Sequence, residues 1–405
     1  MKRLSQLDGI RGLAVALVIL VHLPPLLGIG IGRNLFSICL YRVLHVGWLG
    51  VDIFFVLSGF LITGIIVKDR SKQGFWSGFY MRRSFRILPA FIVVFVITLL
   101  IAHFFLPQIH TSSWYLLAAT FFMANWTVIT DSEMPMLGHL WSLAVEEQFY
   151  FLWPQAAKRL KSTSILKLAL SLAVISELLR ITLATLHVNA YIVYKITPTS
   201  IDGLSIGAAL AVGITLPPVH RFLAVWWQRI ALIAAALLPL AYLALRGSLF
   251  VFNVWSQVLA IPPVIVLTAM LIYGAIESAL PPGLARFLGS PVMTYLGRRS
   301  YALYLIHVPV LIGIERSRAD GALHRLPAGA GINAVLTLSA IAVALLLAEL
   351  SWRIIESPAQ NLRRRLMRGK EDDTPAHPSE EAAITQLSEE NRLPGVVKLR
   401  GHENA

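Results

Sequence analysis

Residues 11–22 read Arg-Gly-Leu-Ala-Val-Ala-Leu-Val-Ile-Leu-Val-His, an apolar run with a cation at its start and a histidine at its end. Both ionisable side chains are costly in lipid, and such residues in a membrane helix usually mark a function. Eleven steps of about 100° bring His22 back to within roughly 20° of Arg11, and eleven rises of about 1.5 Å separate them by roughly 16 Å. The stretch therefore predicts one membrane helix with Arg11 near one surface and His22 near mid-depth on the same face.

The composition is that of a polytopic membrane protein. Of the 405 residues, 56% are hydrophobic and 14% are charged, whereas a soluble domain carries about a quarter charged residues. The chain starts with Met1-Lys2-Arg3 and runs almost directly into an apolar segment, so we expect no cleaved signal peptide. The single cysteine, Cys39, excludes an internal disulfide and a multi-cysteine metal site. We attribute the net charge of +13 to arginines on cytoplasmic loops and expect no nucleic-acid binding.

Eleven apolar segments follow one another along the chain. Most are long enough to cross a hydrocarbon core of about 30 Å. Two of them, 113–129 and 139–156, are short. The full set is 10–30, 46–67, 85–106, 113–129, 139–156, 165–186, 198–214, 229–246, 254–276, 297–315 and 332–354.

The basic loops predict the topology, because lysine and arginine gather on the cytoplasmic side. Only an odd number of crossings fits between the basic loops at 68–86 and 158–167, so one of the two short segments does not span. Since lipid excludes exposed irregular backbone, we predict an all-α bundle of ten transmembrane helices with both termini cytoplasmic. Residues 1–365 would form this transmembrane domain. Residues 366–405 are polar, charged and proline-containing, and we expect a disordered cytoplasmic tail.

Arginines at the cytoplasmic surface are the candidates for binding phosphate. Arg83 and Arg86 share one helix face because they are three residues apart, and Arg11 lies on the same side. They act either as positive-inside anchors or as a clamp for a phosphorylated molecule, which the guanidinium fork suits. For the first helix, a snorkelling Arg11 and a packed His22 compete with His22 as a general base.

The segment Trp-Ser-Leu-Ala-Val-Glu-Glu-Gln-Phe-Tyr at 141–150 carries a second polar face. Ser142, Glu146 and Phe149 or Tyr150 follow helical spacing along it. Glu146 either orients His22 or forms an ion pair with an arginine, since charges in membranes usually find a partner.

Polar residues in two other segments have competing interpretations. Ser300, Tyr304 and His307 form a stripe that could line a polar cavity or serve as a hydrogen-bonded packing stripe. Ser58 and Gly59 favour close helix packing. Four further charges suggest internal salt bridges at helical spacing, in the pairs Glu177–Arg180 and Glu349–Arg353.

Together these motifs resemble those of the acyltransferase-3 family of membrane-bound O-acyltransferases. The family's first-helix signature, a basic residue followed by ten residues and a histidine, matches Arg11 and His22. Its Arg-x-x-Arg motif matches Arg83 and Arg86, and its Ser-Leu-x-x-Glu-x-x-Phe-Tyr motif matches 142–150.

Two more family motifs extend the resemblance. Phe-Phe-x-x-Ser-Gly-Phe matches 54–60, and Ser-Tyr-x-x-Tyr-x-x-His-x-Pro matches 300–309. The motifs occur in the family's order over roughly 4–365. We expect no esterase-like extracytoplasmic domain of the kind that some members carry.

The resemblance implies transfer of an acyl group, commonly acetyl, from acyl-CoA (acetyl-CoA) to a hydroxyl of a carbohydrate or glycoconjugate such as lipopolysaccharide or exopolysaccharide. The protein would be multi-pass in the inner (cytoplasmic) membrane and would need no metal. A covalent acyl-histidine intermediate stays open. The predicted roles are His22 as general base, Glu146 as its orienting partner, Arg11, Arg83 and Arg86 as ligands of acyl-CoA, and Ser142, Tyr150, Tyr304 and His307 as substrate contacts.

Two other classes of protein stay open at the level of sequence. Buried charges also suit a proton-coupled transporter, which would be built from two related halves with interrupted helices. No such internal symmetry is visible. The third class is a membrane scaffold with a regulatory tail. The acceptor, the acyl chain length and the oligomeric state are not encoded in any motif that we recognise.

Overall fold

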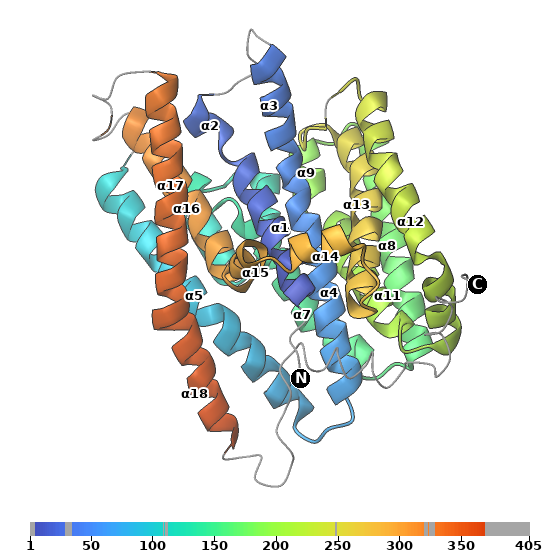
Figure 1. The fold of residues 1–405 in the computed structure, drawn as a ribbon. Coiled ribbons are helices and arrows are strands. Elements are labelled where there is room, and N and C mark those ends of the chain that lie inside the picture. Colours follow the sequence, from blue (N-terminus) through green and yellow to red (C-terminus); the bar gives the residue numbers. More distant parts are fainter. Residues whose placement is uncertain are drawn as a thin grey trace, which may run out of the picture.

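The computed structural model describes residues 5–28, 35–107, 109, 112–247, 249–319, 323 and 329–368. Within these ranges every regular element is a helix, and the long helices lie side by side in a bundle (Figure 1). The all-α prediction is therefore confirmed for the described part of the chain. The predicted tail lies outside the described residues, except that 366–368 still belong to a helix.

The main helices of the bundle have 12 to 31 residues, often follow one another directly, and are connected or followed by helices of at most 12 residues. The long helices are α1 (Ser5–Val21), α4 (Gly50–Asp69), α5 (Phe75–Phe105), α7 (Leu140–Ala157), α8 (Ser162–Thr185), α11 (Asp202–Gly213), α12 (Pro217–Ala244), α13 (Val254–Ile276), α16 (Ser300–Ala319) and α17 (Ala330–Ser351). The short helices are α2 (Pro24–Leu27), α3 (Leu35–His45), α6 (Ser113–Thr120), α9 (Ala190–Lys195), α10 (Thr197–Ser200), α14 (Pro282–Leu288), α15 (Pro291–Arg298) and α18 (Ser357–Arg368). Three 3-10 segments, Val46–Leu49, Ala124–Thr130 and Pro135–Leu137, and one π-helical segment, Trp352–Glu356, complete the described elements.

The described residues contain 6 helices that are long and apolar enough to cross a membrane. They support a multi-pass membrane protein. The prediction of ten crossings stays a prediction, because α1, α7, α11 and α16 are shorter or less apolar than these. The six spans are Ser37–Asp69, Phe75–Phe105, Ser162–Thr185, Pro217–Ala244, Val254–Ile276 and Ala330–Met367.

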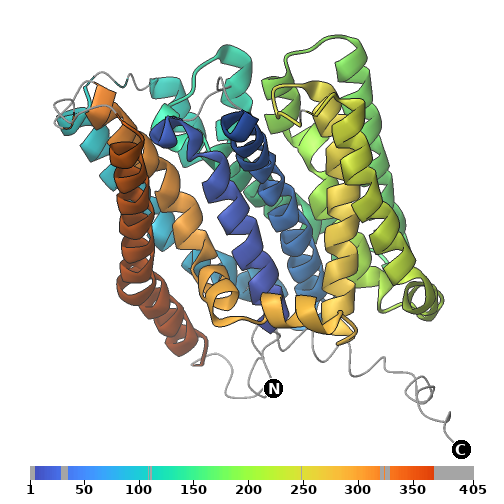
Figure 2. The ribbon, with the colours of Figure 1, turned by 45° about the horizontal axis from the view of Figure 1, so that its top comes forward.

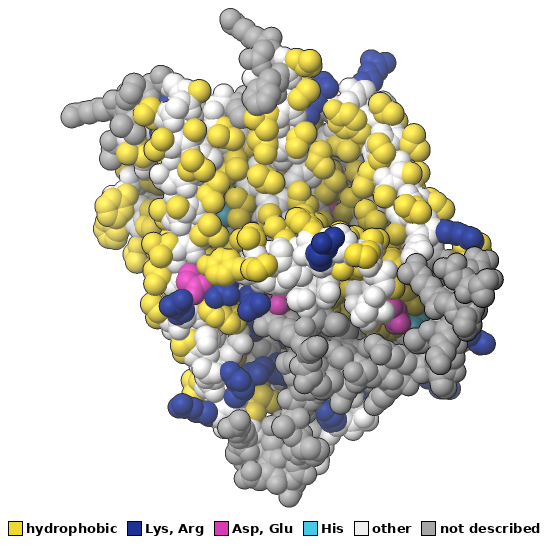
Figure 3. Space-filling model, in the orientation of Figure 1, with side chains coloured by type: hydrophobic (Ala, Val, Ile, Leu, Met, Phe, Trp, Pro, Cys, Tyr) yellow, Lys and Arg dark blue, Asp and Glu magenta, His cyan; other side chains and the backbone are white. Residues whose placement is uncertain are grey.

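The outer surface of the bundle fits a lipid environment. Large aliphatic side chains are exposed along the outer helices, for example Leu232 on α12 and Leu346 on α17. Figure 3 shows hydrophobic side chains over most of one face, with most of its lysines and arginines in the lower part. That part includes α18 and the start of α5, both of which belong to the basic loops of the sequence.

The two short apolar segments have different structures. Segment 113–129 is divided into the 8-residue α6 and a 3-10 segment, and eight residues of helix extend only about 12 Å. Segment 139–156 becomes the continuous 18-residue α7, which extends about 27 Å. Of the two, segment 113–129 is therefore the one too short to span as a single helix.

Several predicted boundaries were wrong for identifiable reasons. The first helix ends at Val21 rather than at residue 30, because Pro24 and Pro25 have no backbone N–H with which to continue its hydrogen bonds. Helix α5 begins at Phe75 rather than at residue 85, because its first turns mix aromatic residues with serine, glycine and arginine and so contain no continuous apolar run. Helix α12 likewise begins at Pro217, ahead of its apolar run.

Glycines bring α4 and α11 into backbone contact. A Cβ atom on Gly59 of α4 would lie 1.9 Å from the carbonyl oxygen of Leu204, and one on Gly207 of α11 would lie 2.0 Å from that of Val56. Only glycine tolerates this distance, as in other close helix pairs of membrane proteins. The prediction that Gly59 permits close packing is confirmed.

The two predicted salt bridges are also confirmed. Arg180 is fully buried on α8, where it bonds Glu177 and, at 2.5 Å, the carboxylate of Asp202 on α11. Arg353 Nε lies 2.6 Å from Glu349. The second pair is not internal as expected, since the Arg353 side chain is 72% exposed.

Helix α1 occupies the middle of the bundle. It contacts α4 and α16, which lie on either side of it in Figure 2, and its amino-terminal half packs on α14 and α15. Because α1 carries Arg11 and His22 directly follows its last residue, this central position lets several helices surround both residues.

Candidate active site

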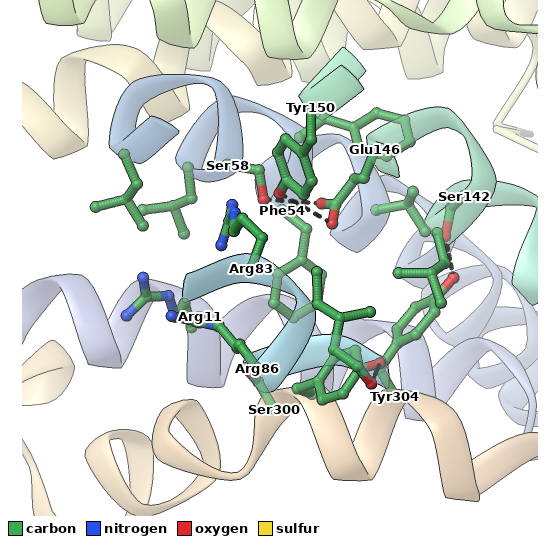
Figure 4. Close-up of a pocket in the computed structure, with 17 residues that line it drawn as sticks. Arg11, Phe54, Ser58, Arg83, Arg86, Ser142, Glu146, Tyr150, Ser300 and Tyr304 are labelled. Atoms are coloured by element: carbon green, nitrogen blue, oxygen red, sulfur yellow. Dashed lines mark hydrogen bonds between the residues drawn. The ribbon is translucent and has the colours of Figure 1, made fainter. Parts of the chain in front are cut away.

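A polar cavity lies among α1, α4, α5, α7 and α16, with an open space of about 780 Å³ including its mouth. The structure brings most of the predicted site residues to this one cavity. Figure 4 shows the three arginines on one side and Ser142 with Tyr304 on the opposite side. The predicted residues that line the cavity are Arg11, Arg83, Arg86, Ser142, Glu146, Tyr150 and Tyr304.

The arginine side of the cavity is built by α1 and α5. Arg83 and Arg86 lie three residues apart on α5. The Arg83 guanidinium lies 4.1 Å from the centre of the Tyr150 ring. A cation over an aromatic face is held by the ring's quadrupole. Arg11 is buried, with Nη1 3.3 Å from Oδ1 of Asp8. Three guanidinium groups from two helices therefore share one wall.

Glu146 is bound to neighbours within the cavity. Its carboxylate accepts hydrogen bonds from Ser58 Oγ at 2.8 Å and from the Tyr150 hydroxyl at 3.2 Å. Ser58, which the sequence suggested only as a packing residue, thus belongs to the cavity wall. The expected contact between Glu146 and His22 is absent from these hydrogen bonds.

His22 takes its orientation from the backbone instead. Its Nδ1 lies 2.7 Å from the carbonyl oxygen of Val18, in the last turn of α1, where carbonyl groups have spare acceptor capacity. Because a carbonyl can only accept, Nδ1 carries the hydrogen and Nε2 keeps its lone pair. The prediction that Glu146 sets the tautomer of His22 is therefore corrected: Val18 sets it.

A cluster of three histidines lies beyond the cavity wall. The His307 ring is 5.0 Å from the His22 ring and 5.4 Å from the His139 ring, between centroids. His307 is fully buried and bonds the carbonyl of Tyr304 at 2.8 Å through Nδ1. Neither His22 nor His307 lines the cavity. In the described part of the chain, these rings do not form a metal-binding group.

Tyr304 separates the cavity from these histidines. Its hydroxyl bonds Ser142 and donates to the carbonyl oxygen of His139 at 2.9 Å, and its ring packs 5.5 Å from the ring of His139. His139 was not predicted from the sequence. The available signal was its position three residues before Ser142, next to the same polar face of α7.

Comparisons with known proteins agree with this arrangement. A family model described as an acyltransferase domain matches residues 4–349. The chain is 28% identical over 380 residues to a putative O-acetyltransferase of Staphylococcus aureus (strain COL), an alignment that covers 88% of this chain and 57% of the relative. It is 28% identical over 378 residues to the O-acetyltransferase OatA of Staphylococcus aureus (strain NCTC 8325 / PS 47), with the same coverage of 88% and 57%. The chain thus spans a little over half the length of these relatives, and no solved structure matches it.

The fold and the cavity define a class: helical membrane enzymes with a polar cavity inside the bundle. With 4–349 matched, the chain belongs to the acyltransferase-3 family, as the sequence motifs predicted. It carries an acyltransferase domain and is related at a distance to O-acetyltransferases. This membership favours the acyltransferase over the transporter and the scaffold.

Proposed function

We propose that the protein transfers an acyl group, acetyl in the simplest case, from acyl-CoA to a hydroxyl of a carbohydrate or glycoconjugate such as lipopolysaccharide or exopolysaccharide. The observation that carries the proposal is the single cavity with three guanidinium groups at one wall and Tyr304, backed by His22 and His307, at the other. The names of the relatives, O-acetyltransferases, agree with it.

We further propose that the bundle crosses the inner (cytoplasmic) membrane ten times with both termini cytoplasmic. The six apolar spans would be completed by α1, α7, α11 and α16. Helix α1 has 17 residues and α16 has 20, which extend about 25 and 30 Å. The basic ends of α5 and α18 would face the cytoplasm.

The arginine wall fits the donor by its chemistry. Guanidinium forks match phosphate oxygens in geometry and charge, and CoA carries its phosphates at the end opposite the thioester. We propose that Arg11, Arg83 and Arg86 bind these phosphates. Glu146 holds the Tyr150 hydroxyl while the Tyr150 ring packs under Arg83, so its proposed role is to position Arg83.

His22 would act on the acceptor. Its Nε2 lone pair takes the proton from the acceptor hydroxyl as the hydroxyl oxygen bonds the acyl carbon. The carbon–sulfur bond then breaks, and the proton passes to the leaving thiolate. Ser142 and Tyr304 lie between the arginine wall and His22, where they would contact the acyl end of the donor, and His307 would contact the acceptor beside His22.

The test is acyl transfer from labelled acetyl-CoA by the purified full-length protein, with His22→Ala beside the wild type. We expect transfer to fall by about 100-fold or more, the scale of general base catalysis, while binding of CoA is retained. Full activity of His22→Ala would exclude the general base role.

The donor wall is tested by Arg83→Ala with Arg86→Ala, which should raise the KM for acetyl-CoA. Arg221→Ala is the matched control, because this arginine is exposed, lies outside the cavity lining and donates from Nε to the backbone carbonyl of Pro217. Equal KM values for the double variant and the control would count against the donor wall.

A further inference from the structure

A second arginine is joined to Arg11 through a buried carboxylate. Asp8 on α1 is 1% exposed, and its two oxygens face different helices. Oδ1 lies 3.3 Å from Arg11 Nη1, and Oδ2 lies 3.7 Å from Arg298 Nε at the end of α15. Arg298 is thereby placed next to the arginine wall although it does not line the cavity.

Glycines fix the position of Arg298 relative to α1. A Cβ atom on Gly12 would lie 2.1 Å from the carbonyl oxygen of Met293, and one on Gly297 would lie 1.8 Å from that of Asp8. The backbones of α1 and α15 are therefore in direct contact at Asp8 and again one turn later at Gly12. Arg298 cannot shift along α1 without breaking this packing.

Arg298 is more peripheral than Arg11. Its side chain is 45% exposed, whereas that of Arg11 is 10% exposed. The neighbouring Arg299 differs, because it is bound to Glu349 at 2.8 Å and packs on the Tyr295 ring. Arg298 thus presents a partly open guanidinium at the basic end of the bundle, just outside the cavity.

We propose that Arg298 binds the 3′-phosphate of CoA and that Asp8 positions it, which makes Arg298 a specificity residue for the donor. This inference rests on the proposed function. CoA carries phosphate at two places: the pyrophosphate joined to the pantetheine arm, and the 3′-phosphate on the ribose. With the thioester directed toward His22, the pyrophosphate meets the cavity arginines, and the 3′-phosphate lies farther out, beside the half-open Arg298.

The experiment compares CoA with 3′-dephospho-CoA, which lacks only the phosphate assigned to Arg298. Equilibrium binding of both ligands is measured on the full-length protein in nanodiscs. The wild type should bind CoA about tenfold more tightly, the scale of one charge-assisted hydrogen bond. Arg298→Gln should weaken the binding of CoA by about tenfold and leave the binding of 3′-dephospho-CoA unchanged.

Three further variants and one control separate specificity from structure. Arg298→Lys keeps the charge without the fork and should give an intermediate ratio. Asp8→Glu should keep more of the preference than Asp8→Asn, because it retains the carboxylate. Arg286→Gln is the matched control, since Arg286 is exposed on the adjacent α14 and does not contact Asp8 in the described ion pairs.

The same variants are tested in turnover with acetyl-CoA and acetyl-dephospho-CoA. Arg298→Gln should raise the KM for acetyl-CoA alone and leave kcat unchanged. The inference would be overturned if the wild type bound both ligands equally. It would also be overturned if Arg298→Gln weakened the binding of both ligands to the same degree. A wild type that binds neither ligand would overturn the proposed function itself.

Discussion

Replacing Gly59 with alanine should force α4 away from α11. The added Cβ would lie 1.9 Å from the carbonyl oxygen of Leu204, 2.6 Å from its carbonyl carbon and 2.8 Å from its Cα. An ordinary contact needs about 3.4 Å, so the oxygen must retreat by about 1.5 Å, and a gap of even 1 Å forfeits up to about half of a van der Waals contact. Because the obstacle is backbone, α11 has to move as a whole.

The free energy of unfolding should fall by about 3 kcal/mol, the upper end of the range for overpacked cores. For a chain of 405 residues, that loss corresponds to a melting midpoint lower by about 3–4 °C. The midpoint is measured for the full-length protein in one detergent by fluorescence-detected size-exclusion chromatography. Transfer should fall as well, since Ser58, next to Gly59, bonds Glu146 in the cavity.

Gly331→Ala is the matched control for this substitution. Gly331 also lies in a helix, but nothing is within 4 Å of the Cβ that alanine would add. Alanine favours a helix over glycine by up to about 1 kcal/mol, so the midpoint should be equal to or slightly above that of the wild type. A Gly59→Ala protein that melts within about 1 °C of Gly331→Ala would refute the close contact of α4 with α11.

Two further predictions concern polar groups in the bundle. Arg180→Met should lower the free energy of unfolding by about 3–5 kcal/mol, because it leaves the buried carboxylate of Asp202 without its partner. Arg353→Ala should lower it by less than about 1 kcal/mol, because this pair is exposed. Equal melting midpoints for these two variants would contradict the difference in burial. Tyr304→Phe should lower the free energy of unfolding by about 1–3 kcal/mol, since Ser142 and the carbonyl of His139 both lose a buried hydrogen-bond partner. An unchanged melting midpoint would show that the Tyr304 hydroxyl makes no such bonds.

Helical spacing and the family motifs predicted seven of the residues that line the cavity, but not that His22 and His307 lie outside its lining. Arg83 and Arg86 lie on one helix face because they are three residues apart, and Glu146 and Tyr150 lie on one face because they are four apart. Such local geometry is set by the helix itself. It does not depend on how the helices pack.

The partners of these residues could not be predicted, because they depend on packing between distant segments. Ser58 and Glu146 are 88 positions apart and meet only because α4 packs against α7. The hydrogen bond of His22 to Val18 depends on where α1 ends. We expected a longer first helix, so this bond could not be predicted. His139 directly precedes α7, and its spacing from Ser142 does not show that Tyr304 and His307 of α16 pack against its ring.

One helix sets the distance between the two ends of the proposed reaction. Gly9 and Gly12 hold the basic end of α1 in backbone contact with α14 and α15, and His22 at the other end is bonded to its own helix. The spacing from Arg11 to His22, about 16 Å, is therefore set by the rise per residue of an α-helix rather than by a loop. A donor whose arm is shorter than pantetheine would be bound by the arginines and still leave its thioester short of the base.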